Sequence, residues 1–367
     1  MSATADDLRF MQLALTLGRR GLGNTWPNPS VGAVVVKDGI VVGRGWTQPG
    51  GRPHAETEAL RRAGPAARDA TLYVTLEPCS HHGKTPPCAD AIVAAGIARV
   101  VSALGDPNPK VAGDGYARLR AAGIAVSEGL FADEARRDHA GHIRRILDGR
   151  PHVTLKLAVS ADGKAALPGG KPAPITGEET RARVHLMRAM NDAILVGIGT
   201  VLADDPALTC RLAGMLASSP VRVVLDRALQ LPHSSRLATS AKEIPVWVFC
   251  AKDAPIERER MLTGLGVTVI RTASGAGGLD LPVVLHALAE RGITRLMVEG
   301  GPKVAASFLR ADLVDEAALL HGPVTIGPDG VDALDGLALG TLTASPDLRL
   351  SDTQMIGGDK LERYERT

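Results

Sequence analysis

His54-Ala-Glu56, Thr75-Leu-Glu-Pro-Cys79 and Pro86-Pro-Cys88 follow one another in the first quarter of the chain. One histidine and two cysteines can hold a zinc ion and leave its fourth coordination position open for water. Glu56 lies two residues after His54, where a carboxylate can move protons to and from that water. The three segments therefore predict a catalytic zinc site with His54, Cys79 and Cys88 as ligands and Glu56 as the catalytic residue.

This combination of residues is typical of zinc deaminases, which remove ammonia from nucleobase-like rings. Each part has a simpler explanation when it is taken alone, because a His-x-Glu pair is usually a helix surface and two cysteines are often unrelated. His81 and His82 lie inside the loop between the cysteines and are alternative ligands. The prolines ahead of both cysteines favour the two-thiolate set.

Length, composition and charge limit the classes of protein to which this chain can belong. The chain has 367 residues, for which two domains are expected, and a formal charge of +2 with no basic patch, which argues against a nucleic-acid partner. No apolar run reaches the roughly 18 residues of a membrane span. The four cysteines and the absence of a signal-like start at Met1 favour a reducing, cytoplasmic location. Cys210 and Cys250 are interpreted as small apolar residues.

Helical and strand patterns alternate along both halves, which predicts an α/β layer structure. In the first half we expect a helix over 6–19 capped by Asp6 or Asp7, a hairpin at 31–43, and a helix over 53–63 with Pro53 in its first turn. The pattern restarts near Pro151. We therefore expect a deaminase domain over 1–147 and a second domain over 148–367.

The spacing of the two cysteines makes the first half more specific. Eight residues separate Cys79 from Cys88, whereas two are common between the thiolates of cytidine, adenosine and guanine deaminases. With Pro27-Asn-Pro-Ser-Val-Gly32 and Asp106-Pro-Asn-Pro109, the long loop resembles the deaminase half of the bifunctional riboflavin-biosynthesis deaminase/reductase family. The resemblance implies a cytidine-deaminase-like three-layer α/β/α fold and a small-molecule substrate, a diaminopyrimidinone bearing a ribosylamino 5′-phosphate.

The same resemblance implies substrate contacts in the first half. Asn28 is expected to hydrogen-bond the ring, and His82 and Lys84 to meet the ring or the phosphate. The alternative for Asn28 is a turn residue between two prolines.

The second half carries three further motifs: Leu155–Lys164, Gly197–Thr209 and Val298-Glu-Gly-Gly-Pro-Lys303. Glycines that lead into a helix let backbone amides approach a diphosphate, although most such turns are only tight turns. The G-x-G-x-x-G fingerprint is absent, which argues against a Rossmann domain. Together the motifs resemble the reductase half of the same family, which implies a dihydrofolate-reductase-like α/β fold and the cofactor NADPH.

That resemblance assigns contacts residue by residue. The cofactor is expected to meet Ala158, Thr200, Asp204, Arg227, Gly301, Pro302, Lys303, Val304, Ala305, Ala306 and Ser307. The substrate is expected to meet Arg188, Leu208, Arg211 and Glu299. Surface positions are the alternative for Arg188 and Arg227, and helix caps for Asp204 and Asp205.

Lys156 and Asp204 are candidates for proton delivery or electrostatic support during reduction. The family often carries a serine and a tryptophan where this chain has Pro172 and Pro174, so no side-chain role is expected there.

The sequence thus favours a bifunctional enzyme that forms a homodimer, as the family commonly does through its second half. Two other hypotheses account for parts of the pattern. One is a nucleoside or tRNA deaminase with an unrelated tail. The other is a binding module in which zinc is structural, which would need His81 or His82 as a fourth ligand and would leave Glu56 without a role.

Overall fold

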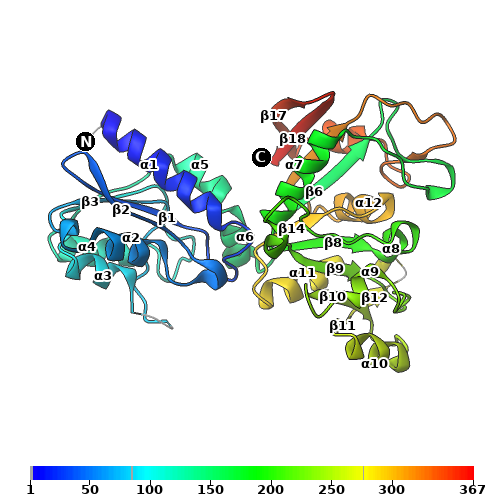
Figure 1. Ribbon diagram of the computed structural model, residues 1–367, viewed down its shortest axis with the longest axis horizontal. Helices are drawn as coiled ribbons and strands as arrows, with labels where there is room; N and C mark the ends of the chain where they lie inside the picture. Colours follow the sequence, from blue (N-terminus) through cyan, green and yellow to red (C-terminus); the bar gives the residue numbers. More distant parts are fainter. Residues whose placement is uncertain (1–2, 84–85, 276) are drawn as a thin grey trace. The chain divides into compact units, whose positions relative to one another are not determined.

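The computed structural model describes residues 3–83, 86–275 and 277–367 (Figure 1). The chain divides into two compact units, Met1–Gly149 and Arg150–Thr367. Lys84, one of the expected substrate contacts, lies outside the described residues. No helix in the part of the chain that the structure describes is long and apolar enough to cross a membrane.

A five-stranded sheet in the order β2-β1-β3-β4-β5 forms the centre of the first unit. β1 runs antiparallel to β2 and β3, whereas β3, β4 and β5 are parallel. The strands are β1 (Gly32–Lys37), β2 (Ile40–Trp46), β3 (Thr71–Val74), β4 (Arg99–Ser102) and β5 (Ala125–Ser127). The helices are α1 (Ala5–Gly18), α2 (Ala55–Ala63), α3 (Cys88–Ala94), α4 (Asp114–Ala121), α5 (Ala132–Asp138) and α6 (Ala140–Asp148).

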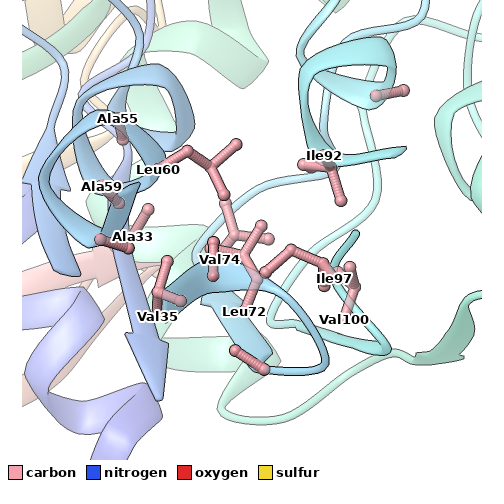
Figure 2. Packing of buried hydrophobic residues seen from close by; sticks show 14 of the residues in the cluster. Ala33, Val35, Ala55, Ala59, Leu60, Leu72, Val74, Ile92, Ile97 and Val100 are labelled. Atoms are coloured by element: carbon pink, nitrogen blue, oxygen red, sulfur yellow. The ribbon is translucent and has the colours of Figure 1, made fainter. Parts of the chain in front are cut away.

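Alternate strand residues face opposite layers of helices. Ala33 and Val35 of β1 join Leu72 and Val74 in a core with α2, α3 and α4, part of which Figure 2 shows. Val34 and Val36 point the other way, into a core with α1 and α5. This two-residue alternation buries both faces of the sheet, and the expected α/β/α arrangement is confirmed.

Two expected helix starts are wrong. α1 is capped by Thr4, whose side chain accepts the amide of Asp7 while Asp7 accepts the amide of Thr4 in return. The acidic residue expected to be the cap is thus the third residue of the helix. α2 begins at Ala55 with His54 as its cap residue, so Pro53 precedes the helix.

A nine-stranded sheet in the order β11-β10-β9-β8-β14-β6-β15-β18-β17 forms the second unit. The strands from β11 to β15 are parallel, and the closing pair β18 and β17 is antiparallel. Their bounds are β6 (His152–Val159), β8 (Ala193–Gly197), β9 (Val221–Leu225), β10 (Val246–Ala251), β11 (Thr268–Thr272), β14 (Arg295–Val298), β15 (Glu316–His321), β17 (Leu348–Ile356) and β18 (Asp359–Arg366).

Helices cover this sheet and bury its apolar strands. The helices are α7 (Glu178–Ala189), α8 (Ile198–Asp204), α9 (Arg236–Thr239), α10 (Ile256–Gly264), α11 (Leu281–Glu290), α12 (Pro302–Arg310) and α13 (Gly340–Thr343). Four short strands complete the unit: β7 (Lys164–Ala166) with β16 (Val331–Asp332), and β12 (Ser274–Gly275) with β13 (Gly278–Leu279). The expected α/β pattern of the second half is confirmed.

Candidate active sites

The three expected metal ligands converge in the first unit. His54 caps α2, Cys88 opens α3, and Cys79 lies on the segment that leaves β3. One ligand atom from each lies within 4.8 Å of the others. His54 Nδ1 is 3.3 Å from Cys88 Sγ and 3.8 Å from Cys79 Sγ. Bond lengths of tetrahedral zinc place a nitrogen and a sulfur ligand about 3.5 Å apart, so the cluster fits zinc.

The charge state of one of the two thiols, Cys79, also fits a metal site. The hydrogen bond between them lowers the pKa of Cys79 to about 4, and His54 stabilises the same thiolate. The hydrogen bond to that thiolate, together with burial, raises the pKa of Cys88. The Cys88 amide also donates to Cys79 Sγ at 3.3 Å. A thiolate is the form of cysteine that binds metals, so Cys79 is prepared for that role.

Glu56 lies on the first turn of α2 and is only 4% exposed. Burial raises the pKa of its carboxyl, and the nearby charge of His54 partly offsets this increase. A carboxyl group whose pKa is raised towards neutrality can both accept and return a proton. Its position beside His54 and Cys88 suits proton transfer at the cluster.

The other expected contacts of the first unit differ in their surroundings. Asn28 donates from Nδ2 to the carbonyl of Gly51 at 2.8 Å and lies 3.5 Å from His54 Nε2. It lies beside His54, in a turn where its backbone amide donates to the carbonyl of Thr25 at 3.0 Å, so it is both a turn residue and a neighbour of the proposed metal site. His82 is exposed on the loop between the cysteines.

Glu77 is a supporting residue that sequence reasoning missed. Its buried carboxylate accepts the backbone amides of Asp106 at 3.0 Å, Gly113 at 3.0 Å and Gly115 at 2.9 Å. It thereby ties the segment after β4 to the chain two residues before Cys79. The available signal was a charged residue directly after an apolar strand and ahead of a ligand.

In the second unit, the expected residues lie at one edge of the sheet. β9, β8, β14 and β6 are parallel neighbours, so their carboxyl ends meet at the same edge. Arg227 follows β9, Thr200 follows β8, Glu299 and Gly301 follow β14, and Ala158 is near the end of β6. Ligands of open parallel sheets bind outside the carboxyl ends of the strands.

The glycine turn after β14 is held by α8. Thr200 Oγ1 accepts the amide of Gly301 at 3.1 Å, and Gly301 caps α12. A side chain at Gly300 would meet Val304 at 2.8 Å, so the turn requires glycine there. Among the expected cofactor contacts on this helix, Lys303 is exposed, Gly301, Pro302, Val304 and Ser307 are half-buried, and Ala305 and Ala306 are fully buried.

Glu299 lies between two basic side chains. Lys156 Nζ donates to it at 3.2 Å, and Arg188 donates through Nε and Nη2, both at 3.0 Å. Burial alone would raise the pKa of Glu299, but the charges of Lys156 and Arg188 lower it to about 2. Two hydrogen bonds from one guanidinium group to a carboxylate fix the orientation of both side chains as well as pairing their charges.

The segment after α8 holds the remaining expected contacts. Asp204 ends α8 and is exposed, whereas Leu208 is 3% exposed with a left-handed φ of 56°. Arg211 is exposed further along the segment. Pro172 and Pro174 are exposed as well, beside the buried Ile175.

Comparison with known proteins identifies both units. Residues 4–104 match the cytidine and deoxycytidylate deaminase zinc-binding region, and residues 151–361 match the RibD C-terminal domain. The second match shows that the alternative of a deaminase with an unrelated tail is wrong.

Relatives extend over nearly the whole chain. The riboflavin biosynthesis protein RibD of Escherichia coli (strain K12) is 42% identical over 96% of this chain and 97% of its own length. The corresponding protein of Aquifex aeolicus is 40% identical and covers 98% of both chains.

Solved structures of two proteins are similar to this chain over nearly its whole length. Acinetobacter baumannii RibD superposes with a TM-score of 0.87 at 36% identity over 99% of both chains. A Thermotoga maritima diaminohydroxyphosphoribosylaminopyrimidine deaminase/5-amino-6-(5-phosphoribosylamino)uracil reductase gives 0.85 at 37% identity over 98% of both chains. The chain therefore belongs to the riboflavin biosynthesis protein RibD family.

Proposed function

We propose that this chain catalyses two consecutive steps of riboflavin biosynthesis. The first unit deaminates 2,5-diamino-6-ribosylamino-4(3H)-pyrimidinone 5′-phosphate, and the second unit reduces the ribosyl group of the product to give 5-amino-6-(5-phospho-D-ribitylamino)uracil. The observation that carries the proposal is the cluster of His54, Cys79 and Cys88 with the buried Glu56 beside it. Its presence in one chain with a RibD C-terminal domain points to both activities.

In the deamination, His54, Cys79 and Cys88 would hold the zinc ion, which supplies a Lewis acid that makes water nucleophilic near neutral pH. Glu56 accepts one proton from the attacking water and delivers it to the ring nitrogen. It then carries the second proton to the departing amine, so that water and the amine become a ring carbonyl and ammonia. Asn28 lies beside His54 and is proposed to orient the ring.

In the reduction, NADPH would lie along the carboxyl ends of the strands and supply a hydride. Thr200, Arg227 and the turn at Gly301 are proposed to hold the cofactor, with Arg227 at its 2′-phosphate. The hydride goes to C1 of the ribosyl group after ring opening, and one proton completes the reaction. Lys156 or Asp204 is proposed to deliver that proton.

One experiment tests both assignments. The purified protein is incubated with the diaminopyrimidinone ribosyl phosphate, with and without NADPH, and the ammonia and pyrimidine products are measured. We expect ammonia alone without NADPH, and a ribityl product together with NADPH oxidation when the cofactor is present. Ammonia release that itself requires NADPH would contradict two separate sites.

We also propose a homodimer in the cytoplasm. β17 forms one edge of the nine-stranded sheet and exposes Leu350 and Met355, and an exposed edge strand can pair with a second copy. The four cysteines are all free thiols, which suits a reducing compartment. Sedimentation of the wild type and of a Met355→Lys variant tests the dimer, and we expect the variant to shift towards monomer.

A further inference from the structure

His185 lies on α7 and contacts the segment that leads to Arg211. Its Nδ1 atom is 3.1 Å from the carbonyl oxygen of Thr209, and the backbone amide of Arg211 donates to the same atom at 3.4 Å. Arg188, three residues later on the same helix, donates from Nη1 to the same carbonyl at 3.2 Å. His185 and Arg188 together therefore hold this segment on α7.

Nδ1 of His185 faces both an acceptor and a donor. A carbonyl oxygen only accepts hydrogen bonds and a backbone amide only donates them, so Nδ1 bonds Thr209 when it carries a proton and Arg211 when it does not. The imidazolium that forms when the pH falls carries a proton on both nitrogens and donates from Nδ1 to Thr209.

The charges that act on His185 come from three segments. Arg188 lies on its own helix, Arg211 follows Thr209, and Glu299 follows β14. Burial lowers the pKa of His185 most, and the two arginines lower it further, while Glu299 opposes them. Glu299 is already hydrogen-bonded to Arg188 and Lys156. The surroundings of the imidazole are thus positive, and they suit an anion.

We propose that His185 is a positioning residue that places Arg211 beside Arg188 for the substrate phosphate and takes up a proton when that phosphate binds. The inference rests on the proposed reductase function of the second unit. Two guanidinium groups on neighbouring segments match a phosphate dianion, and an imidazolium close enough to feel both adds a third positive charge.

The direction of the pH effect follows from linkage. A bound dianion offsets the repulsion by Arg188 and Arg211, so the pKa of His185 is higher in the complex than in the free protein. Phosphate affinity should therefore increase as the pH falls towards 6. The phosphate ester itself loses charge near pH 6, and this effect is the same for every variant.

The variants separate the two roles of the side chain. His185→Asn keeps an amide that can donate to Thr209 but cannot become charged, and His185→Leu loses both properties. His286→Asn is the matched control, because His286 also contacts a carbonyl through Nδ1, that of Pro282, but lies on α11. KM and kcat for reduction of the deaminated substrate are measured between pH 6 and 8.5 with saturating NADPH.

We expect KM of the wild type to fall by about threefold more than that of His185→Asn from pH 8.5 to 6, because the pKa of His185 in the free protein is lowered and pH 6 reaches only part of the linked gain in affinity. His185→Leu should raise KM about fivefold or more at every pH, the effect of one lost hydrogen bond, with kcat within about threefold. His286→Asn should match the wild type. Equal KM profiles for the wild type and His185→Asn would overturn the proposal, as would a loss of kcat alone in His185→Leu.

A second measurement does not depend on turnover. Ribose 5-phosphate is titrated into the full chain at pH 7 by calorimetry in two buffers of different ionisation enthalpy. Net proton uptake that exceeds that of His185→Asn supports the inference, and equal uptake refutes it. An enzyme that fails to reduce the pyrimidine yet shows this uptake would disprove the proposed function while the role of His185 stands.

Discussion

Arg188 donates two hydrogen bonds to the carboxylate of Glu299, and both are 3.0 Å long. The two residues are 111 positions apart in the chain and come from α7 and the turn after β14. Both were expected to contact substrate, but the structure shows them in contact with each other. Only the N–H groups of Arg188 that are not bonded to Glu299 or Thr209 could therefore reach a substrate phosphate. Arg211 is then needed as the second cation for the phosphate.

The first prediction concerns Glu56. Glu56→Gln keeps the volume of the side chain but removes the group that accepts protons, so deamination should fall by about 10²- to 10⁴-fold. Zinc content, measured by atomic emission, should stay near one per chain because His54, Cys79 and Cys88 are unchanged. Glu58→Gln on the same helix is the control, since Glu58 pairs with Arg61 and Arg62 outside the cluster. Normal deamination by Glu56→Gln would disprove the mechanism.

The second prediction separates the two units. Cys88→Ala removes a zinc ligand, so zinc content and deamination should both be lost, while NADPH oxidation with the deaminated substrate should continue. Cys250→Ala is the matched control, because Cys250 is buried in a core of the second unit, and it should retain zinc. Full zinc content in Cys88→Ala would remove that residue from the ligand set.

The third prediction concerns Glu299 and pH. Its pKa in the folded state is lowered from 4.5 to about 2, so its stabilising effect is complete above pH 4.5 and is lost as the pH falls towards 2. The pH-dependent part should amount to about 3 kcal/mol, because each pKa unit corresponds to about 1.4 kcal/mol. Glu299→Gln should lack this part.

Trp247 on β10 provides the measurement, since the other tryptophans, Trp26 and Trp46, belong to the first unit. Urea unfolding is followed by Trp247 fluorescence in a Trp26→Phe/Trp46→Phe background at several pH values from 2.5 to 6. If the free energy of unfolding changed with pH in the same way in the background protein and in its Glu299→Gln variant, the low pKa of Glu299 would be contradicted.

The fourth prediction concerns Glu77. Glu77→Ala leaves the amides of Asp106, Gly113 and Gly115 without their acceptor, so the first unit should lose about 3 kcal/mol or more of unfolding free energy. Hydrogen exchange should increase most at residues 105–116. Exchange there that equals the wild type would show that water replaces the carboxylate without cost.

The group of His54, Cys79 and Cys88 illustrates what local sequence can predict. His54, Cys79 and Cys88 are rare residue types that the chemistry of zinc requires. His54 and Cys88 lie at the starts of helices, and Cys79 lies on the loop after a strand. The loop of eight residues between the cysteines then distinguished the riboflavin-biosynthesis family from the cytidine, adenosine and guanine deaminases. The alternation of strands and helices in the second half was predictable because buried parallel strands are continuous apolar runs.

The sequence by itself therefore determined the two α/β halves, the residues that form the proposed metal site, and the family. Only the tertiary structure decided that Glu77 organises the segment after β4, that Arg188 pairs with Glu299, and that His185 holds the backbone of Thr209. The physical reason is that a carboxylate, guanidinium or imidazole group can form hydrogen bonds with many different partners. Which partner it meets depends on the order of strands in the sheet, and local patterns do not record that order.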